Sequence, residues 1–244
     1  MRNIKLEISY DGTDFSGWQR QPKQRTVEGD ITKALKRLTG EDVNLVGAGR
    51  TDAGVHAKGQ VANFFTDLEI PPEKIPHAIR YMLPKDVSIK SSEEVPIDFH
   101  SRFSAKRKIY RYIVYNEKLP DALKRRYTKF FPYKMDFDLL EEVFSGFIGK
   151  HDFSSFMARG ANDHNVYKEI FRSEVYKNGA EIHFVVEGDA FLRNMVRIMV
   201  GTACSIAAGW IAFENFPKMF EGLGREAAGP TFDSCGLYLE KVIY

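Results

Sequence analysis

The first ten residues alternate between apolar and polar side chains. Every second residue from Ile4 to Tyr10 is apolar, and the residues between them are polar. This period of two is typical of a strand with one buried face. Asp11-Gly12 then supplies a turn signal. The pattern predicts a half-buried strand over residues 3–10.

The period changes to that of a helix after residue 26. Apolar residues recur every three to four positions from Val27 to Leu38, and acidic residues occupy the first turn. Thr26 stands where a helix N-cap is expected, and Gly40 stands where a helix usually ends. The spacing therefore predicts an amphipathic helix between Thr26 and Gly40.

The rest of the chain mixes both periods. Asn178-Gly179 between two alternating runs is a strong signal for a hairpin. We expect strands near 43–48, 58–66, 86–91, 107–115, 170–177, 181–187 and 237–243, and helices near 73–83, 136–147, 190–208 and 214–222. Strict alternation of strand and helix is absent. The expected fold class is therefore α+β, a mixed, mostly antiparallel sheet with helices packed on it.

Length and composition narrow the class of protein. The chain has 244 residues, 43% of them hydrophobic and 28% charged, which suits a globular protein with two α/β halves. We expect the halves to be residues 1–103 and 104–244 and to share one sheet. Two cysteines are too few for a disulfide framework, which favours a cytoplasmic location. The most apolar stretch contains Arg197, so we expect a buried helix there and no membrane span.

Basic residues are concentrated in one segment. Residues 102–134 hold eleven lysines and arginines against two acids, a net charge of +9. The remaining chain holds 24 bases and 31 acids, a net charge of −7. Such asymmetry suggests a surface that binds a polyanion, although a solvated loop would look the same.

The segment 47–56 combines three glycines with an arginine and a carboxylate. It reads Gly-Ala-Gly-Arg-Thr-Asp-Ala-Gly-Val-His. No Gly-Lys-Ser/Thr follows, which excludes a Walker A loop, and Asp52 occupies the place of the third glycine of a dinucleotide fingerprint. From the residues alone, Asp52 is either a catalytic carboxylate on a tight loop or an aspartate that caps its own turn.

The chain resembles the tRNA pseudouridine synthase A family over nearly its whole length. The family signature is matched by Gly49-Arg50-Thr51-Asp52-Ala53-Gly54-Val55-His56-Ala57. Four further matches follow the family's order: Tyr10-Asp11-Gly12-Thr13 with Phe15-Ser16-Gly17-Trp18-Gln19; Phe99 to Ala105 with Tyr110-Arg111-Tyr112; Phe191 to Thr202; and Ala228-Gly229-Pro230-Thr231 with Gly236-Leu237-Tyr238-Leu239.

This resemblance implies the isomerisation of uridine to pseudouridine in the anticodon stem-loop of tRNA, at roughly positions 38–40. Asp52 would be the catalytic carboxylate, and the two halves would flank a central RNA-binding cleft. An isomerisation needs no cofactor and no metal, and we expect neither. The resemblance further implies a homodimer.

The family pattern also assigns roles to three other residues. Tyr110 matches a tyrosine that lies against the target base, Arg197 an arginine that pairs with the aspartate, and Leu237 an apolar residue beside the site. Arg50 could touch phosphate or brace its own loop. Arg197 lies in an apolar helix, where a charge needs a partner or a route to water. A polar stripe shared with Arg193, four residues earlier, is the competing interpretation.

RNA contacts are expected from the basic residues Lys106, Arg107 and Lys108. Two stretches, 162–167 and Arg193-Asn194, depart from the family pattern, which leaves open a relative with altered specificity. Two other functions remain as alternatives. One is an RNA-binding α/β module without catalysis, which would not need Asp52. The other is a nucleoside or glycoside hydrolase, which would need a second well-placed acid.

Overall fold

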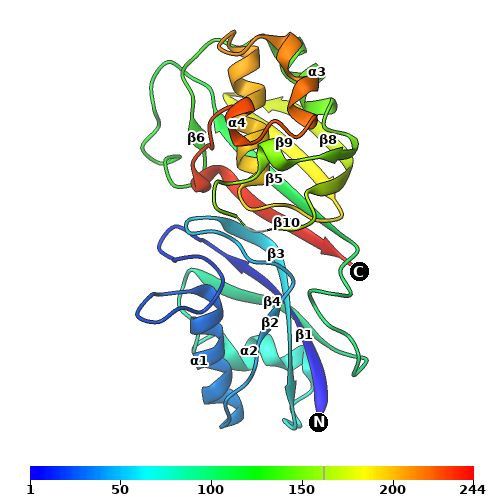
Figure 1. The fold of residues 1–244 in the computed structure, drawn as a ribbon. Coiled ribbons are helices and arrows are strands. Elements are labelled where there is room, and N and C mark those ends of the chain that lie inside the picture. The colour runs from blue at the N-terminus through cyan, green and yellow to red at the C-terminus, as the bar shows by residue number, and fades with distance from the viewer. Residues whose placement is uncertain (162) are drawn as a thin grey trace. The chain divides into compact units, whose positions relative to one another are not determined.

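The chain divides into two units, both drawn in Figure 1. Unit 1 comprises residues 1–106 and 238–244, and unit 2 comprises residues 107–237. The computed structural model describes residues 1–161 and 163–244; Asn162, within one of the departures from the family pattern, lies outside them. The sequence-based division at 103/104 assigned the last strand to the second half, whereas its contacts group residues 238–244 with unit 1.

Unit 1 is built on a sheet with the strand order β4-β1-β3-β10. β10 pairs with β3 in parallel, and the other ladders of the unit are antiparallel. The short strand β2 pairs with β3 as well. The elements are β1 (Arg2–Tyr10), α1 (Val27–Thr39), β2 (Val46–Gly47), β3 (His56–Thr66), a 3-10 turn (Pro72–Lys74), α2 (Ile75–Ile79), β4 (Val87–Val95) and β10 (Leu237–Ile243).

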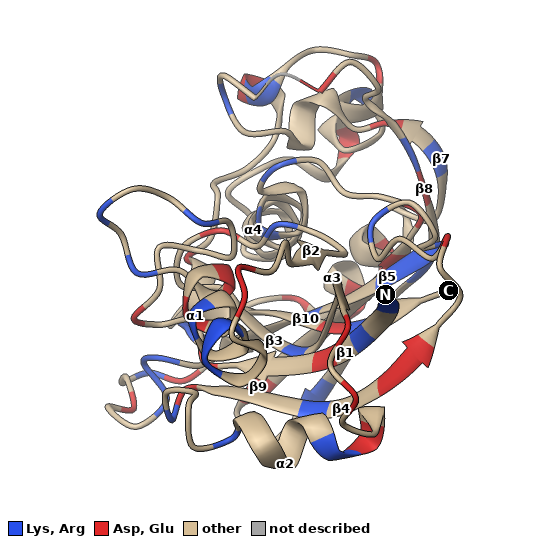
Figure 2. Ribbon diagram, turned by 90° about the horizontal axis from the view of Figure 1, so that it is seen from below, with Lys and Arg blue, Asp and Glu red and all other residues tan. Residues whose placement is uncertain are grey.

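The two faces of β1 explain why this strand forms. Ile4, Leu6 and Ile8 are fully buried, each stabilising the fold by about 1.5–3 kcal/mol. On the polar face, Lys90 of β4 pairs with Glu7 at 2.9 Å, and Lys5 pairs with a glutamate of β4. Figure 2 shows the resulting blue and red segments along β1 and β4. The prediction for residues 3–10 is confirmed.

The first helix is also confirmed, including both of its ends. The Thr26 side chain accepts a hydrogen bond from the Gly29 amide, and Gly40 adopts the left-handed conformation with φ of 81°. Ile31 and Leu35 are fully buried. A threonine cap of this kind contributes about 1 kcal/mol. The cap fixes where the chain leaves the preceding loop, which carries the first family motif.

Unit 2 contains the antiparallel order β5-β9-β8-β7, with β6 added to β5 in parallel. The elements are β5 (Arg107–Tyr115), β6 (Lys129–Phe130), α3 (Phe137–Ser145), β7 (Gly149–Asp152), β8 (Tyr167–Asn178), β9 (Glu181–Gly188) and α4 (Met195–Ala207), with 3-10 turns at Ser154–Phe156, Phe213–Asn215, Pro217–Phe220, Arg225–Ala227 and Ser234–Gly236. The β8–β9 hairpin turns at Gly179, with φ of 59°, as predicted. Both units therefore confirm the α+β class.

Aromatic side chains fill the core of unit 2. Phe144 of α3 lies edge-on against Phe184 of β9, with ring centroids 5.0 Å apart. Phe147 makes similar edge contacts with Phe156 and Phe216. All but Phe216 are fully buried. Edge-to-face packing adds about 0.5–1.5 kcal/mol per pair to the burial of the rings. This core fixes the inner face of β5 and the position of α4.

Three predicted helices differ from those observed. The helix expected over 73–83 is reduced to the 3-10 turn at Pro72–Lys74 and the short α2, which ends at Ile79. The helix expected over 190–208 begins only at Met195, because Asn194 has φ of 62° and interrupts the helical backbone. The helix expected over 214–222 consists of two 3-10 turns instead. Pro217 has no amide hydrogen and so cannot continue an α-helical ladder. Among the described residues, none of the helices combines the length and apolar character required to cross a membrane.

Candidate active site

The loop that carries Asp52 links β2 to β3 in unit 1. The Val55 amide donates to the Asp52 carbonyl at 3.2 Å, and Gly54 has φ of 77°. This is a tight turn that a side chain at position 54 would strain. Asp52 itself is half-buried. The turn therefore places a short carboxylate at a fixed point of the loop, where solvent and a ligand can still reach it.

Buried polar contacts hold the loop from inside the unit. The Tyr10 and Thr51 hydroxyl oxygens lie 2.7 Å apart, and both residues are buried. The Gln60 amide donates to the Gly49 carbonyl at 2.9 Å. Burial raises the pKa of Tyr10 well above its usual value, while its hydrogen bonds to Thr51 and Gln60 lower it. The phenol thus stays protonated and keeps its contact with the residue just before Asp52.

A second loop, residues 11–19, packs directly on the Asp52 loop. The Trp18 amide donates to the Thr51 carbonyl at 3.0 Å, and the Gly54 amide donates to the Phe15 carbonyl at 3.3 Å. A Cβ atom on Gly17 would lie 2.7 Å from the Thr51 oxygen. Gly17 also has φ of 89°. Only glycine allows this approach, so the first motif and the segment around Asp52 are linked by packing.

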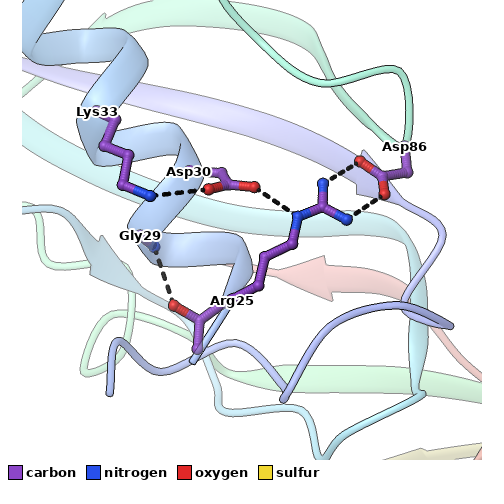
Figure 3. Close-up of polar contacts among 6 residues, drawn as sticks. Arg25, Gly29, Asp30, Lys33 and Asp86 are labelled. Carbon is purple, nitrogen blue, oxygen red and sulfur yellow. Dashed lines mark hydrogen bonds and ion pairs between the residues drawn. The ribbon is translucent and has the colours of Figure 1, made fainter. Parts of the chain in front are cut away.

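Arg25 lies just before the N-cap of α1 and contacts this second loop; its hydrogen bonds are drawn in Figure 3. Its guanidinium forms two hydrogen bonds of 2.8 Å with Asp86 and one of 3.0 Å with Asp30. It also lies over the Phe15 ring, 4.0 Å from the centroid. The hydrogen bonds to Asp86 raise the pKa of Arg25. The fork joins the loop to α1 and to the start of β4.

His56 has a structural environment. Its ring is 2% exposed and stacks on Tyr238 of β10, with centroids 4.8 Å apart. Its Nδ1 atom accepts a hydrogen bond from the Gly12 amide at 3.1 Å. The same Nδ1 lies 3.2 Å from a carboxylate oxygen of Asp11. His56 therefore ties β3 to the second loop, residues 11–19.

Tyr110 and Tyr112 share the inner face of β5 in unit 2. Tyr112 is fully buried, and its hydroxyl donates to the Asp233 carbonyl at 2.6 Å. Tyr110 retains 8% exposure and meets Phe191 edge-on, with centroids 4.9 Å apart. Tyr112 is thus a core residue. Tyr110 has an aromatic wall beside it and lies closer to the surface.

Arg197 is half-buried in the first turn of α4 and is held in place. Its Nε donates to the Phe232 carbonyl at 2.7 Å, and its Nη1 donates to the Asn194 side-chain oxygen at 2.8 Å. Both acceptors are neutral, so the positive charge is oriented without being neutralised by them. Arg193 is exposed and precedes the helix, so the polar helical stripe proposed for Arg193 and Arg197 does not form.

The other predicted residues occupy varied environments. Leu237 is 7% exposed at the start of β10. Arg50, Lys106 and Arg107 are exposed, and Lys108 is half-buried. Exposure suits contacts with RNA phosphates. Asp52 belongs to unit 1 and Arg197 to unit 2, so their pairing stays a prediction.

The chain is similar to known proteins over its whole length. The sequence profile described as tRNA pseudouridine synthase matches residues 8–104 and 143–244. The chain belongs to the tRNA pseudouridine synthase family. Relatives named tRNA pseudouridine synthase A include those of Acetivibrio thermocellus and Caldicellulosiruptor saccharolyticus, each 45% identical over all of both chains. The relative from Moorella thermoacetica is 43% identical over 99% of both chains.

One solved structure also shows a distant likeness, titled Crystal Structure of a Cbf5-Nop10-Gar1 Complex. The match has 12% identity and a TM-score of 0.39, and it covers 97% of this chain and 58% of the other. In this synthase-family chain, the described residues contain no group of three His, Cys, Asp or Glu side chains able to hold a metal ion.

Sequence reasoning missed the residues that brace the site. Gln60, Asn194 and Phe232 carry no functional signal of their own, although each fixes a candidate residue or its loop. Gln60 could have been noticed as an amide inside the largely apolar strand β3, where a buried polar side chain needs a specific partner. The role of the Phe232 carbonyl could not, because a backbone acceptor has no sequence signature.

Proposed function

We propose that this protein isomerises uridine to pseudouridine in the anticodon stem-loop of tRNA, with Asp52 as its catalytic carboxylate. The observation that carries the proposal is the position of Asp52 on a glycine turn braced by the loop 11–19 and by Tyr10 of β1. A carboxylate held in this way can act on a reacting atom without first losing conformational freedom. The family membership of the chain points to the same chemistry.

The reaction exchanges one bond for another. The glycosidic bond between N1 and the ribose C1′ breaks, the base turns, C5 bonds to C1′, and the proton on C5 moves to solvent while N1 gains one. Substrate and product have the same composition, so the step balances without a cofactor. A uridine stacked in RNA hides its glycosidic bond and must be flipped out, at a cost of a few kcal/mol.

Tyr110 and Leu237 would contact the flipped base, and Arg197 would pair with Asp52. Stacking on an aromatic ring stabilises an extruded base by about 1–3 kcal/mol, which offsets much of the flipping cost. A guanidinium beside Asp52 would keep that carboxylate ionised and oriented. The two hydrogen bonds that hold Arg197 support this role, because they fix the orientation of the guanidinium.

The tRNA body would lie on basic residues outside the reaction centre. Arg50, Lys106 and Lys108 are suitable contacts, together with Arg107, which is partly engaged by Glu187 at 3.0 Å. We also propose that the protein works in the cytoplasm as a homodimer. A two-fold dimer would let one subunit hold the tRNA while the other performs the chemistry. Sedimentation that finds a fully active monomer would reject the dimer.

The experiment that tests the function uses tRNA transcript labelled with tritium at C5 of uridine. Formation of the new C5–C1′ bond releases the label to water. We expect release by the parent protein, no release by Asp52→Asn, and similar tRNA affinity for both proteins, because the carboxylate acts on the transition state. Binding without release by the parent would instead identify an RNA-binding module. Release by Asp52→Asn at the parent rate would mean that another residue is the catalyst.

A further inference from the structure

Unit 2 contains a cavity that the site described above does not use. Its volume is about 670 Å³, and it is lined by residues of the 3-10 turn at Arg225–Ala227, the following loop and the residues before α4. Three arginines and one acid contribute to its lining: Arg159, Arg193, Arg225 and Glu226. The charged lining residues therefore carry a net charge of +2.

The single acid does not neutralise the three cations. Glu226 pairs with Arg159 at the rim, where the two side chains are 69% and 76% exposed. Arg225 donates instead to the Ala228 carbonyl and to the Thr231 hydroxyl, both at 3.1 Å. Burial, with the charge of Arg159, lowers the pKa of Arg225. Within residues 1–161 and 163–244, neither Arg193 nor Arg225 forms a salt bridge with a carboxylate.

The wall of the cavity is rigid. The Gly229 amide donates to the Thr202 hydroxyl of α4 at 2.9 Å. A Cβ atom on Gly201 would lie 2.0 Å from the Pro230 oxygen, so the loop rests directly on the helix backbone. The residue that precedes α4, Asn194, lines the cavity and gives the helix no side-chain cap. The positive end of the helix dipole therefore adds to the charge of the arginines.

The cavity adjoins the residues that hold Arg197. Asn194 lines it and also accepts the hydrogen bond from Arg197. Thr231 lines it, and the next residue, Phe232, accepts the second hydrogen bond from Arg197. An anion in the cavity would thus lie beside the guanidinium proposed to meet the catalytic carboxylate. The exposed rim at Arg159 and Glu226 leaves room for a polymer to enter.

We propose that the cavity around Arg193 and Arg225 binds a backbone phosphate of the tRNA close to the target uridine. The proposal rests on the function proposed above. Arginine offers a planar fork of donors that matches phosphate oxygens, and the partial burial of Arg225 strengthens its interaction relative to an exposed lysine. A phosphate held at this point would keep the strand in register after its base has left the stack.

Arg193→Ala tests the proposal, because the Arg193 side chain is exposed and makes no hydrogen bond to the rest of the described chain. Lys150→Ala is the matched control, an exposed cation of unit 2 that does not line the cavity. We expect Arg193→Ala to weaken tRNA binding about 5–10-fold and to flatten the slope of log affinity against log salt by about 0.7–0.9. The control should change neither.

Anticodon stem-loop RNAs with one neutral methylphosphonate at a time then locate the contact. At one position near the target, the neutral linkage should weaken binding by the parent and by Lys150→Ala but not by Arg193→Ala. Weakening of Arg193→Ala by the same factor as the parent at every position would overturn the proposal. The proposal would also be overturned if inorganic phosphate raised the melting temperature of the parent but not of Arg193→Ala while both proteins bound tRNA equally well. The cavity would then be a site for an adventitious ion only. If the parent protein formed no pseudouridine in these RNAs, the proposed function itself would be rejected instead.

Discussion

The contact between Tyr10 and Thr51 offers the sharpest test of how the fold positions Asp52. Tyr10→Phe removes one oxygen atom and leaves the ring in its fully packed place. The Thr51 hydroxyl, 2.7 Å away, and Gln60 then lose a buried partner. An unsatisfied buried polar group costs about 1–3 kcal/mol. For a chain of this size, 1 kcal/mol corresponds to about 2–4 °C in melting temperature.

Two variants separate positioning from stability. Tyr244→Phe is the control, since its hydroxyl donates to the Ser101 carbonyl at 2.8 Å, away from the Asp52 loop. Tyr10→Phe combined with Thr51→Val removes both partners, which should recover part of the stability lost by Tyr10→Phe. Turnover should remain low in the double variant, because the residue before Asp52 is still unanchored.

The assay measures single-turnover tritium release and tRNA affinity together with thermal unfolding. We expect Tyr10→Phe to lower the rate at saturating enzyme by about tenfold, the equivalent of 1.4 kcal/mol in the barrier. Its tRNA affinity should stay close to that of the parent. The reasoning is refuted if Tyr10→Phe loses stability but keeps the parent rate, or if Tyr244→Phe lowers the rate as much.

Three further predictions follow from other contacts. Arg25→Lys keeps the charge but loses the pair of hydrogen bonds to Asp86, and it should lower stability by about 1 kcal/mol and reduce turnover. Turnover equal to that of the parent would show that the guanidinium does not support the Asp52 loop. Arg197→Met should lower turnover severely while circular dichroism stays that of the parent, and a parent-like rate would remove the proposed pairing with Asp52. Burial raises the pKa of Tyr10 above its value in the unfolded chain. The protonated phenol therefore contributes fully to stability below about pH 10, and this contribution is lost by about 1.4 kcal/mol per pH unit as the pH rises further. Between pH 9 and 11, the free energy of unfolding measured from denaturation curves should therefore fall less steeply with pH for Tyr10→Phe than for the parent.

Elements whose signals lie within a few residues were predictable from the sequence. The helix between Thr26 and Gly40 and the strand 107–115 match the structure, because caps and side-chain periods are local properties. Other elements turned out shorter than predicted, because the patterns do not reveal every local feature of the backbone. The strand expected over 43–48 is reduced to Val46–Gly47. Asn194 and Pro217 limit the two C-terminal helices through backbone conformation and a missing donor.

The candidate residues themselves came from the sequence, since motif order and residue type are visible there. Their surroundings came only from the tertiary structure. Tyr10 and Thr51 are 41 positions apart, and the close approach of Gly17 to the Thr51 carbonyl depends on two loops meeting. The arginines of the unit 2 cavity are likewise scattered between positions 159 and 225. Hydrogen bonds and charges act over a few ångströms, so residues distant in sequence form a site only when packing of the core brings their strands and helices together.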